Sequence, residues 1–130
     1  MTKIIDACIK SVPIVAFESE CNIEASIGDP VVFSQSDDNT VESLTSNVYD
    51  NRLVVGIISA KAEPTQCTVV TMGILENITT GLTRGLPLWV ALDGSLTTTK
   101  PSSGHLQVLG NSISSTSISV NLEMRKVKLI

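Results

Sequence analysis

The sequence is a succession of short β-favouring runs separated by turn residues, and this pattern constrains the fold more than any other feature. Runs rich in Val, Ile, Leu and Thr are interrupted by Gly, Pro, Asn and Asp, and long helical periodicity is absent. We therefore expect an all-β fold, a small β-barrel or β-sandwich of about eight to ten short strands. The expected strands are residues 11–17, 30–34, 53–60, 66–73, 86–92, 95–99, 105–110, 117–124 and 125–130.

Several turns can be placed from local chemistry. Asp93-Gly94 is the strongest hairpin signal and predicts a turn between Leu86–Leu92 and Ser95–Thr99, because both residues tolerate positive backbone angles. Gly56, inside an apolar run, indicates a bulge or a close backbone approach. Ser36–Thr40 is interpreted as a polar loop.

The core is expected to be aliphatic, since aromatic residues make up only 3% of the chain while hydrophobic residues make up 42%. Trp89 is interpreted as a core anchor, with an interface hot spot as the alternative. The residues expected to be mostly buried are Val31, Phe33, Leu53, Val55, Ile57, Val70, Leu88, Val90, Val108 and Val120.

Charge argues against a nucleic-acid binder, because the net charge is −4 and such domains are normally basic. The charge is uneven: residues 1–50 carry nine acidic and two basic residues, and residues 51–130 carry four acidic and seven basic residues. Two interpretations stay open. The charges are scattered on a solvated surface, or they orient neighbouring copies head to tail.

Cys8, Cys21 and Cys67 are expected to be reduced and free of metal, because an odd number without a C-x-x-C pair fits neither a disulfide framework nor a zinc site. The first residues are not expected to form a signal peptide, since Asp6 breaks the apolar run. No stretch approaches the length of a membrane helix, so no membrane partner is expected.

The search for chemistry predicts no enzyme and assigns no catalytic, cofactor-binding or metal-binding residues. His105 is expected at an exposed strand start. Asp37-Asp38 is interpreted as a solvated loop, with a weak calcium site as the alternative. The basic stretch Arg125–Lys128 is interpreted as a solvated strand edge, or as a surface for an acidic neighbouring subunit. Phosphate-binding and nucleophile-elbow motifs are absent.

From Gly28 onward the order of motifs resembles a small β-barrel module of tailed-phage virion proteins. In that family a "GD-x-V" strand leads to "VGI" and "V-x-x-G" strands, then to a "GL-T-x-G" turn, "G-x-L-T-T-x-P" and a "Q-x-V-G" strand. Trp89 stands where the family often has Tyr, and Leu109 interrupts the usual V-G pair. The matching segments are 28–33, 53–58, 68–73, 81–90, 94–101 and 105–110.

The resemblance implies a single β domain over residues 1–130, with residues 28–130 as the barrel module and residues 1–27 as an N-terminal arm or attachment strands. It implies a capsid decoration (cement) protein located in the virion and made in the bacterial host cytoplasm. The implied partners are further copies of the chain, as a homotrimer, and the major capsid protein or other virion subunits. No cofactor is expected.

Two alternatives accompany this interpretation. One is a tail or fibre module that binds a host receptor or carbohydrate, which the few aromatic residues disfavour. The other is a small hydrolase, for which we find no set of residues. The apolar stretch Thr2–Phe17 is expected either to attach to a partner or to form the first strands of the same barrel.

Overall fold

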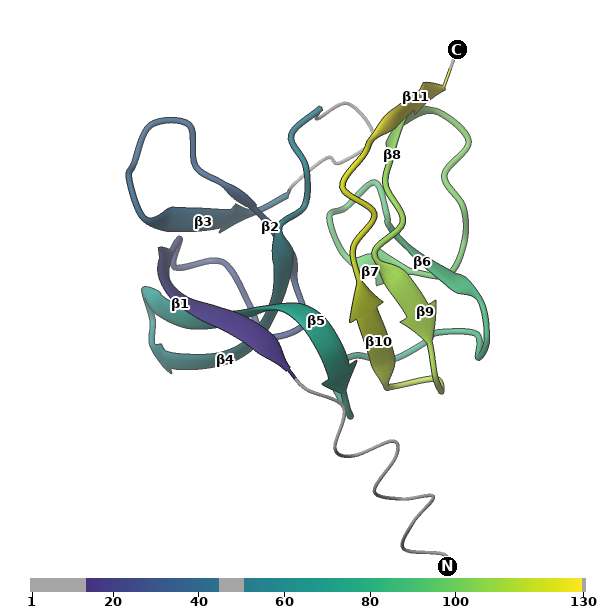
Figure 1. Cartoon of the computed structure of the whole chain (residues 1–130), viewed down its shortest axis with the longest axis horizontal. Helices are drawn as coiled ribbons and strands as arrows, with labels where there is room; N and C mark the ends of the chain where they lie inside the picture. The colour runs from purple at the N-terminus through teal and green to yellow at the C-terminus, as the bar shows by residue number, and fades with distance from the viewer. Residues whose placement is uncertain (1–13, 45–50, 130) are drawn as a thin grey trace, which may run out of the picture.

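A computed structural model describes residues 14–44 and 51–129, and within these ranges the chain is all-β, as predicted (Figure 1). It contains short strands joined by turns and loops. The strands are β1 (Val15–Cys21), β2 (Pro30–Phe33), β3 (Thr40–Ser43), β4 (Gly56–Glu63), β5 (Gln66–Leu75), β6 (Pro87–Val90), β7 (Leu96–Thr97), β8 (Gly104–Leu106), β9 (Gly110–Ser112), β10 (Ile118–Asn121) and β11 (Val127–Leu129).

The first five strands close into a barrel. Their hydrogen-bonded order is β1-β3-β2-β4-β5, and β5 pairs again with β1, so the ring has no free edge. The β1–β3 pair is parallel, whereas the other barrel pairs are antiparallel. Full closure removes the unpaired strand edges that otherwise invite aggregation.

The barrel interior is filled by small and β-branched side chains. Because successive residues of a strand point to opposite faces, each barrel strand sends alternate residues inward. The interior cluster contains Cys21, Ala25, Val31, Val41, Ile58, Cys67 and Val69, with Phe17 and Val55 packed against it. Few large aromatic rings fit such a narrow barrel, which agrees with the aliphatic core expected from composition.

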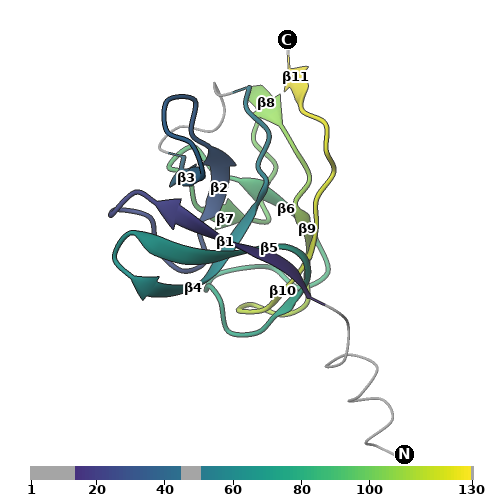
Figure 2. The ribbon, with the colours of Figure 1, turned by 60° about the vertical axis from the view of Figure 1, so that its left-hand side comes forward.

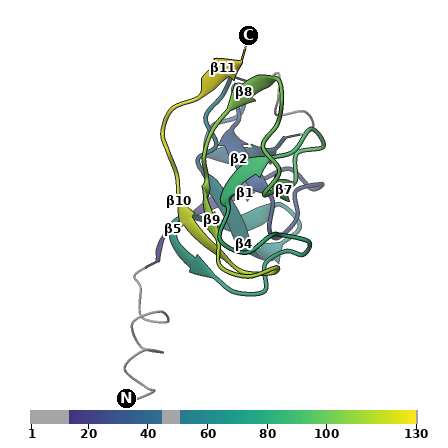
Figure 3. The same cartoon turned by 90° about the vertical axis from the view of Figure 1, so that its right-hand side faces the viewer.

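A second group of strands packs beside the barrel, and the long strand β5 connects the two. The C-terminal half of β5 leaves the barrel and pairs with β10, which continues the sheet through β9 and β6 to β7. Figures 1 and 2 show these green and yellow strands beside the barrel. Strands β8 and β11 form a separate two-stranded sheet at the end of the molecule where the described chain finishes (Figure 3).

The larger core lies between the barrel and the second group of strands. Val32, Ile57 and Val70 point outward from the barrel into this core, next in sequence to residues that point into the barrel interior. Strands β2, β4 and β5 are therefore covered on both faces where these residues lie, which explains their continuous apolar runs. From the second group the core takes Leu88, Val90, Leu109, Ile118 and Val120.

Strand β1 corrects the boundary at residue 27. Val15–Cys21 pairs with both β3 and β5 and completes the barrel, so these residues are a barrel strand and not part of an arm. The expected strand 11–17 covers only the start of β1, and the motif series begins at Gly28, so neither showed that β1 pairs with β3 and β5. Residues 1–13 lie outside the described residues, and the arm that we expected there stays a prediction.

Other expectations need correction in detail. Strand β3 was not predicted, and Thr40, assigned to a polar loop, begins it. The run 105–110 is divided between β8 and β9. Of the residues expected to be buried, Leu53, Val55 and Val108 are only half-buried. Phe33 was wrong: it ends β2 and is 54% exposed, and its ring packs against that of Phe17.

The two glycine expectations hold. Asp93 and Gly94 form the turn between β6 and β7, in which Gly94 has a φ of 89° and donates a hydrogen bond to the carbonyl of Ala91 (2.9 Å). Asp93 accepts hydrogen bonds from the hydroxyl and backbone N–H of Ser95, which lower its pKa. At Gly56 a Cβ would lie 2.7 Å from the carbonyl oxygen of Val70, so the glycine marks a close backbone approach.

Candidate interaction surfaces

An apolar hollow lies where β1, β2, β5 and the end of β10 meet. We call it the apolar groove. It has a volume of about 360 Å³, and its polar lining comes from Thr71 and Asn121. Its apolar lining comes from Phe17, Phe33, Val55, Met72, Leu122 and Met124.

The apolar groove combines an aromatic pair with flexible side chains. The rings of Phe17 and Phe33 lie 6.0 Å apart at an interplanar angle of 35°, within the usual range for an aromatic pair. Met72 and Met124 are each at least half exposed. Methionine side chains are flexible and polarisable, and they are common at surfaces that bind apolar partners. This combination suits a protein segment with aliphatic side chains.

A second hollow contains the single tryptophan. Leu88 and Val90 on either side of it enter the core, so Trp89 points to the other face of β6 and is only half-buried, which corrects its assignment as a core anchor. The Nζ of Lys100 lies 5.9 Å from its ring centroid, a cation–π distance. The remaining lining includes Leu106, Val108, Glu123, Arg125, Val127 and Leu129.

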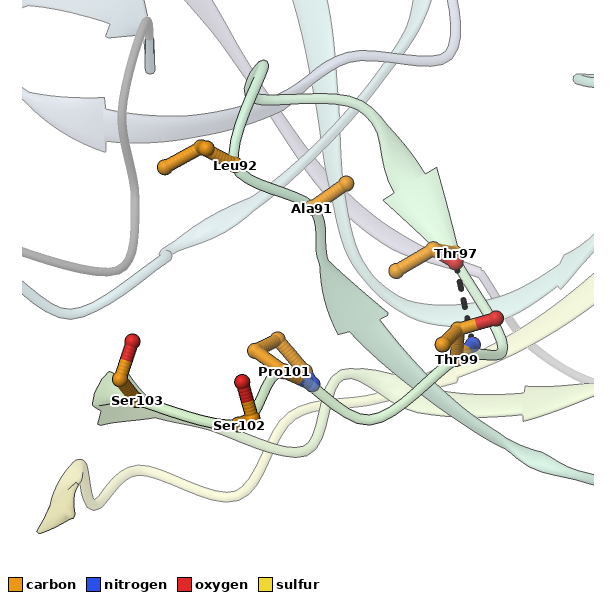
Figure 4. Close-up of a pocket in the computed structure, with 7 residues that line it drawn as sticks. All are labelled: Ala91, Leu92, Thr97, Thr99, Pro101, Ser102 and Ser103. Carbon is orange, nitrogen blue, oxygen red and sulfur yellow. Dashed lines mark hydrogen bonds between the residues drawn. The ribbon is translucent and has the colours of Figure 1, made fainter.

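A third hollow is lined mainly by small side chains and hydroxyl groups, as Figure 4 shows. It lies between the β6–β7 hairpin and the loop before β8, and its lining includes Thr97, Ser102 and Ser103. Within it the Oγ1 of Thr97 accepts a hydrogen bond from the backbone N–H of Thr99 (3.0 Å). Without a charged or aromatic side chain in this lining, the hollow offers hydrogen bonds but no strong anchor for a ligand.

The residues that the sequence search weighed for chemistry do not come together. His105 lies on β8, half-buried, and Asp37 and Asp38 lie on the exposed loop between β2 and β3. Within residues 14–44 and 51–129, no group of three or more His, Cys, Asp or Glu side chains is placed to hold a metal ion. In the same ranges, no helix is long and apolar enough to cross a membrane.

Cys21 and Cys67 are free thiols buried inside the barrel, and Cys8 lies outside the described residues. Burial and a hydrogen bond with Cys21 raise the pKa of the Cys67 thiol to about 12. Since the thiolate is the reactive form, we expect the buried Cys67 thiol to react slowly in the folded protein.

We expect iodoacetamide at neutral pH to leave Cys21 and Cys67 unmodified in the folded chain and to modify both in denaturant. The reason is that both side chains are buried inside the barrel, so the reagent reaches them only when the barrel opens. Intact-mass spectrometry before and after denaturation should therefore differ by two adducts if Cys8 reacts in the folded chain and by three if it does not. Modification of Cys67 in the folded chain at the rate of a free thiol would contradict the closed barrel.

Comparison with solved structures finds a similarity to the N base of head fibre protein gp8.5 of bacteriophage phi29. The TM-score is 0.45 and the sequence identity 16%, over 90% of this chain and 100% of that chain. No protein-family model and no curated protein matches the sequence.

Sequence reasoning missed the apolar groove, although it noted some of its parts. Phe17 and Phe33 were counted as scarce aromatic residues, and Phe33 was placed in the core. Met72 and Leu122 lay within predicted strands without an assigned face. The groove joins residues more than 100 positions apart, from Phe17 to Met124, so it depends on the pairing of β5 with both β1 and β10. The available signal was that apolar and polar residues stop alternating at the end of each run.

Proposed function

We propose that the chain is a non-catalytic structural subunit of a tailed-bacteriophage virion that decorates and stabilises the capsid. The observation that carries this proposal is the ordered series of turn and strand motifs from Gly28 to Gly110. No single motif is specific, but their order resembles that of a virion β-barrel module. In this proposal the β-barrel is a scaffold, and the residues on its surface determine what it binds.

The apolar groove supports a role in binding protein. Soluble proteins seldom leave adjoining apolar side chains exposed unless a partner covers them. Here Phe33, Met72 and Met124 are all exposed around one hollow. On a capsid, each such contact can be weak, because many copies act together on a lattice of repeated sites.

The proposed partners are other copies of the chain, assembled as a homotrimer, and the major capsid protein or other virion subunits. The uneven charge supports this arrangement, because the acidic first 50 residues and the basic remainder favour one orientation of neighbouring copies. The proposed location is the virion, with synthesis in the host cytoplasm.

A tail or fibre module that binds a receptor carbohydrate is the second candidate, and one observation favours it. Trp89 presents a half-buried ring beside the charged side chains of Lys100, Glu123 and Arg125. Rings of this kind stack against sugars, and neighbouring charged groups hydrogen-bond to hydroxyl groups. Against it, the ring already carries the Lys100 ammonium group.

The test is cryo-electron microscopy of the particle that contains this chain, at a resolution that traces its strands. We expect density at repeated symmetry positions on the outer capsid surface. Density confined to the tail or its fibres would overturn capsid decoration and favour the second candidate. A particle assembled without this gene should be less resistant to heating or to low salt, and unchanged resistance would contradict a stabilising role.

A further inference from the structure

The apolar groove has no partner among the described residues, yet its construction is that of a binding site. It joins a tilted pair of phenylalanine rings to two exposed methionines, and its two polar groups, Thr71 and Asn121, lie in its lining. An aliphatic segment that entered it would cover side chains that otherwise remain in water, which is favourable in proportion to the area covered.

The described chain begins at the rim of this groove. Val15 pairs with Met72, which lines the groove, and Ile14 lies so close to Gly73 that a Cβ there would be 2.9 Å from an Ile14 side-chain atom. The 13 residues before Ile14 are therefore attached within one or two residues of the groove. Their place of attachment limits what they can reach.

The composition of residues 1–13 matches the groove. Ile4, Ile5 and Ile9 are large and aliphatic, and the segment holds no aromatic residue that would need a wider cavity. Its charged residues are Lys3, Asp6 and Lys10, which separate the apolar pairs and keep an unbound segment soluble. Fully extended, 13 residues span roughly 40 Å, which exceeds the width of a small domain's face.

The direction of β1 decides whose groove the segment fills. Phe17 pairs with Val69 and Val15 with Met72, so the chain, followed back toward its start, runs along β5 toward Gly73 and away from Phe17. To enter its own groove the segment would have to reverse beside Ile14. To enter the groove of an adjacent copy it continues in its own direction.

We propose that residues 1–13 of one copy bind in the apolar groove of a second copy. Such a contact joins two different surfaces, a segment and a groove, so it is heterologous and can close into a ring. The contact between segment and groove requires only this chain. Its use in the particle rests on the proposed function.

The first measurement is the mass of the full chain by light scattering after size-exclusion chromatography. Met72→Lys places a charge in the groove, and Ile4→Asp combined with Ile5→Asp places charges in the segment. Leu92→Lys is the matched control, because Leu92 is an exposed aliphatic residue that lines a different hollow. We expect oligomers for the unaltered chain and for the control, and monomers for both the groove variant and the segment variant.

Mixing the two monomeric variants tests the exchange directly. The groove variant keeps an intact segment, and the segment variant keeps an intact groove. An equimolar mixture should therefore form one-to-one complexes that neither variant forms alone. If each segment filled its own groove, or if the copies joined through another face, mixing would restore nothing and the proposal would be overturned.

Two further measurements distinguish a loss of the segment–groove contact from misfolding and from failure of the proposed function. The circular dichroism spectrum of each variant must match that of the unaltered chain, which the exposure of Met72 leads us to expect; a groove variant with an altered spectrum is replaced by Met124→Lys. Retained oligomers in both variants would overturn the segment–groove contact while leaving capsid decoration untouched. Correct self-association without binding to particles would overturn the proposed function and leave the contact standing.

Discussion

Replacing Gly94 by alanine should destabilise the protein by about 4 kcal/mol or more, the largest effect we expect from a single methyl group. Gly94 has a φ of 89°, where a side chain is strained, and a Cβ at this position would lie 1.6 Å from the carbonyl oxygen of Leu44. Leu44 follows β3 of the barrel, so the β6–β7 turn and the barrel backbone would have to separate. The oxygen belongs to the backbone, and it cannot move aside as a side chain does.

Gly85→Ala is the matched control. Gly85 has nearly the same φ, 82°, but no atom lies within 4 Å of the Cβ it would gain. Gly85→Ala should therefore destabilise the protein only through backbone strain, by about 1–2 kcal/mol. Urea unfolding followed by circular dichroism measures both losses. Equal losses in the two variants would show that the contact between this turn and Leu44 is absent.

Gln107→Leu should cost about 2–5 kcal/mol, because it leaves two buried backbone groups without partners. The Oε1 of Gln107 accepts a hydrogen bond from the N–H of Val54 (2.7 Å), and its Nε2 donates one to the Val54 carbonyl (3.0 Å). Gln107 and Val54 are both buried. The side-chain amide thus serves Val54 as a neighbouring strand would, and it ties the second group of strands to the segment that enters β4.

Two further variants serve as controls for Gln107→Leu. Gln35→Leu alters an exposed loop residue and should change the free energy of unfolding by less than about 0.5 kcal/mol. Gln107→Glu keeps an acceptor for the Val54 N–H, but its charged form has no donor for the carbonyl. Burial raises the pKa of the introduced carboxyl group, so the variant should regain stability as the pH falls and this group becomes protonated. Stability that is independent of pH in Gln107→Glu would argue that the side chain is not buried against Val54.

Local chemistry allowed much of the fold to be predicted from the sequence. The Asp93-Gly94 turn, the close approach at Gly56 and the all-β class all depend on residues near one another in the chain. Strand β3 was not predicted because Thr40–Ser43 is short and follows a polar loop. Its pairing with β2 and β1, rather than its composition, makes it a strand.

The faces of the strands were harder to predict than the strands. Val31 and Val32 are both buried because they serve two different cores, whereas Phe33, of stronger apolar character, is exposed. Alternation places Phe33 on the same face as Val31, and it could not show that this end of β2 stays uncovered, since that depends on strands far away in the sequence. The apolar groove follows from the same uncovered end, and it was inaccessible to sequence reasoning for the same reason.

The closure of the barrel by its first strand has a consequence for synthesis at the ribosome. Val15 has its partner in Met72, and the parallel partner of β1 begins at Thr40, so the earliest strand to emerge cannot pair until most of the barrel sequence has followed. Such non-local pairing makes folding slow relative to helical domains of equal size. During that interval the edge of β1 is open to pairing with other nascent chains. A chain translated in many copies at once would therefore benefit from chaperones until β5 has left the exit tunnel.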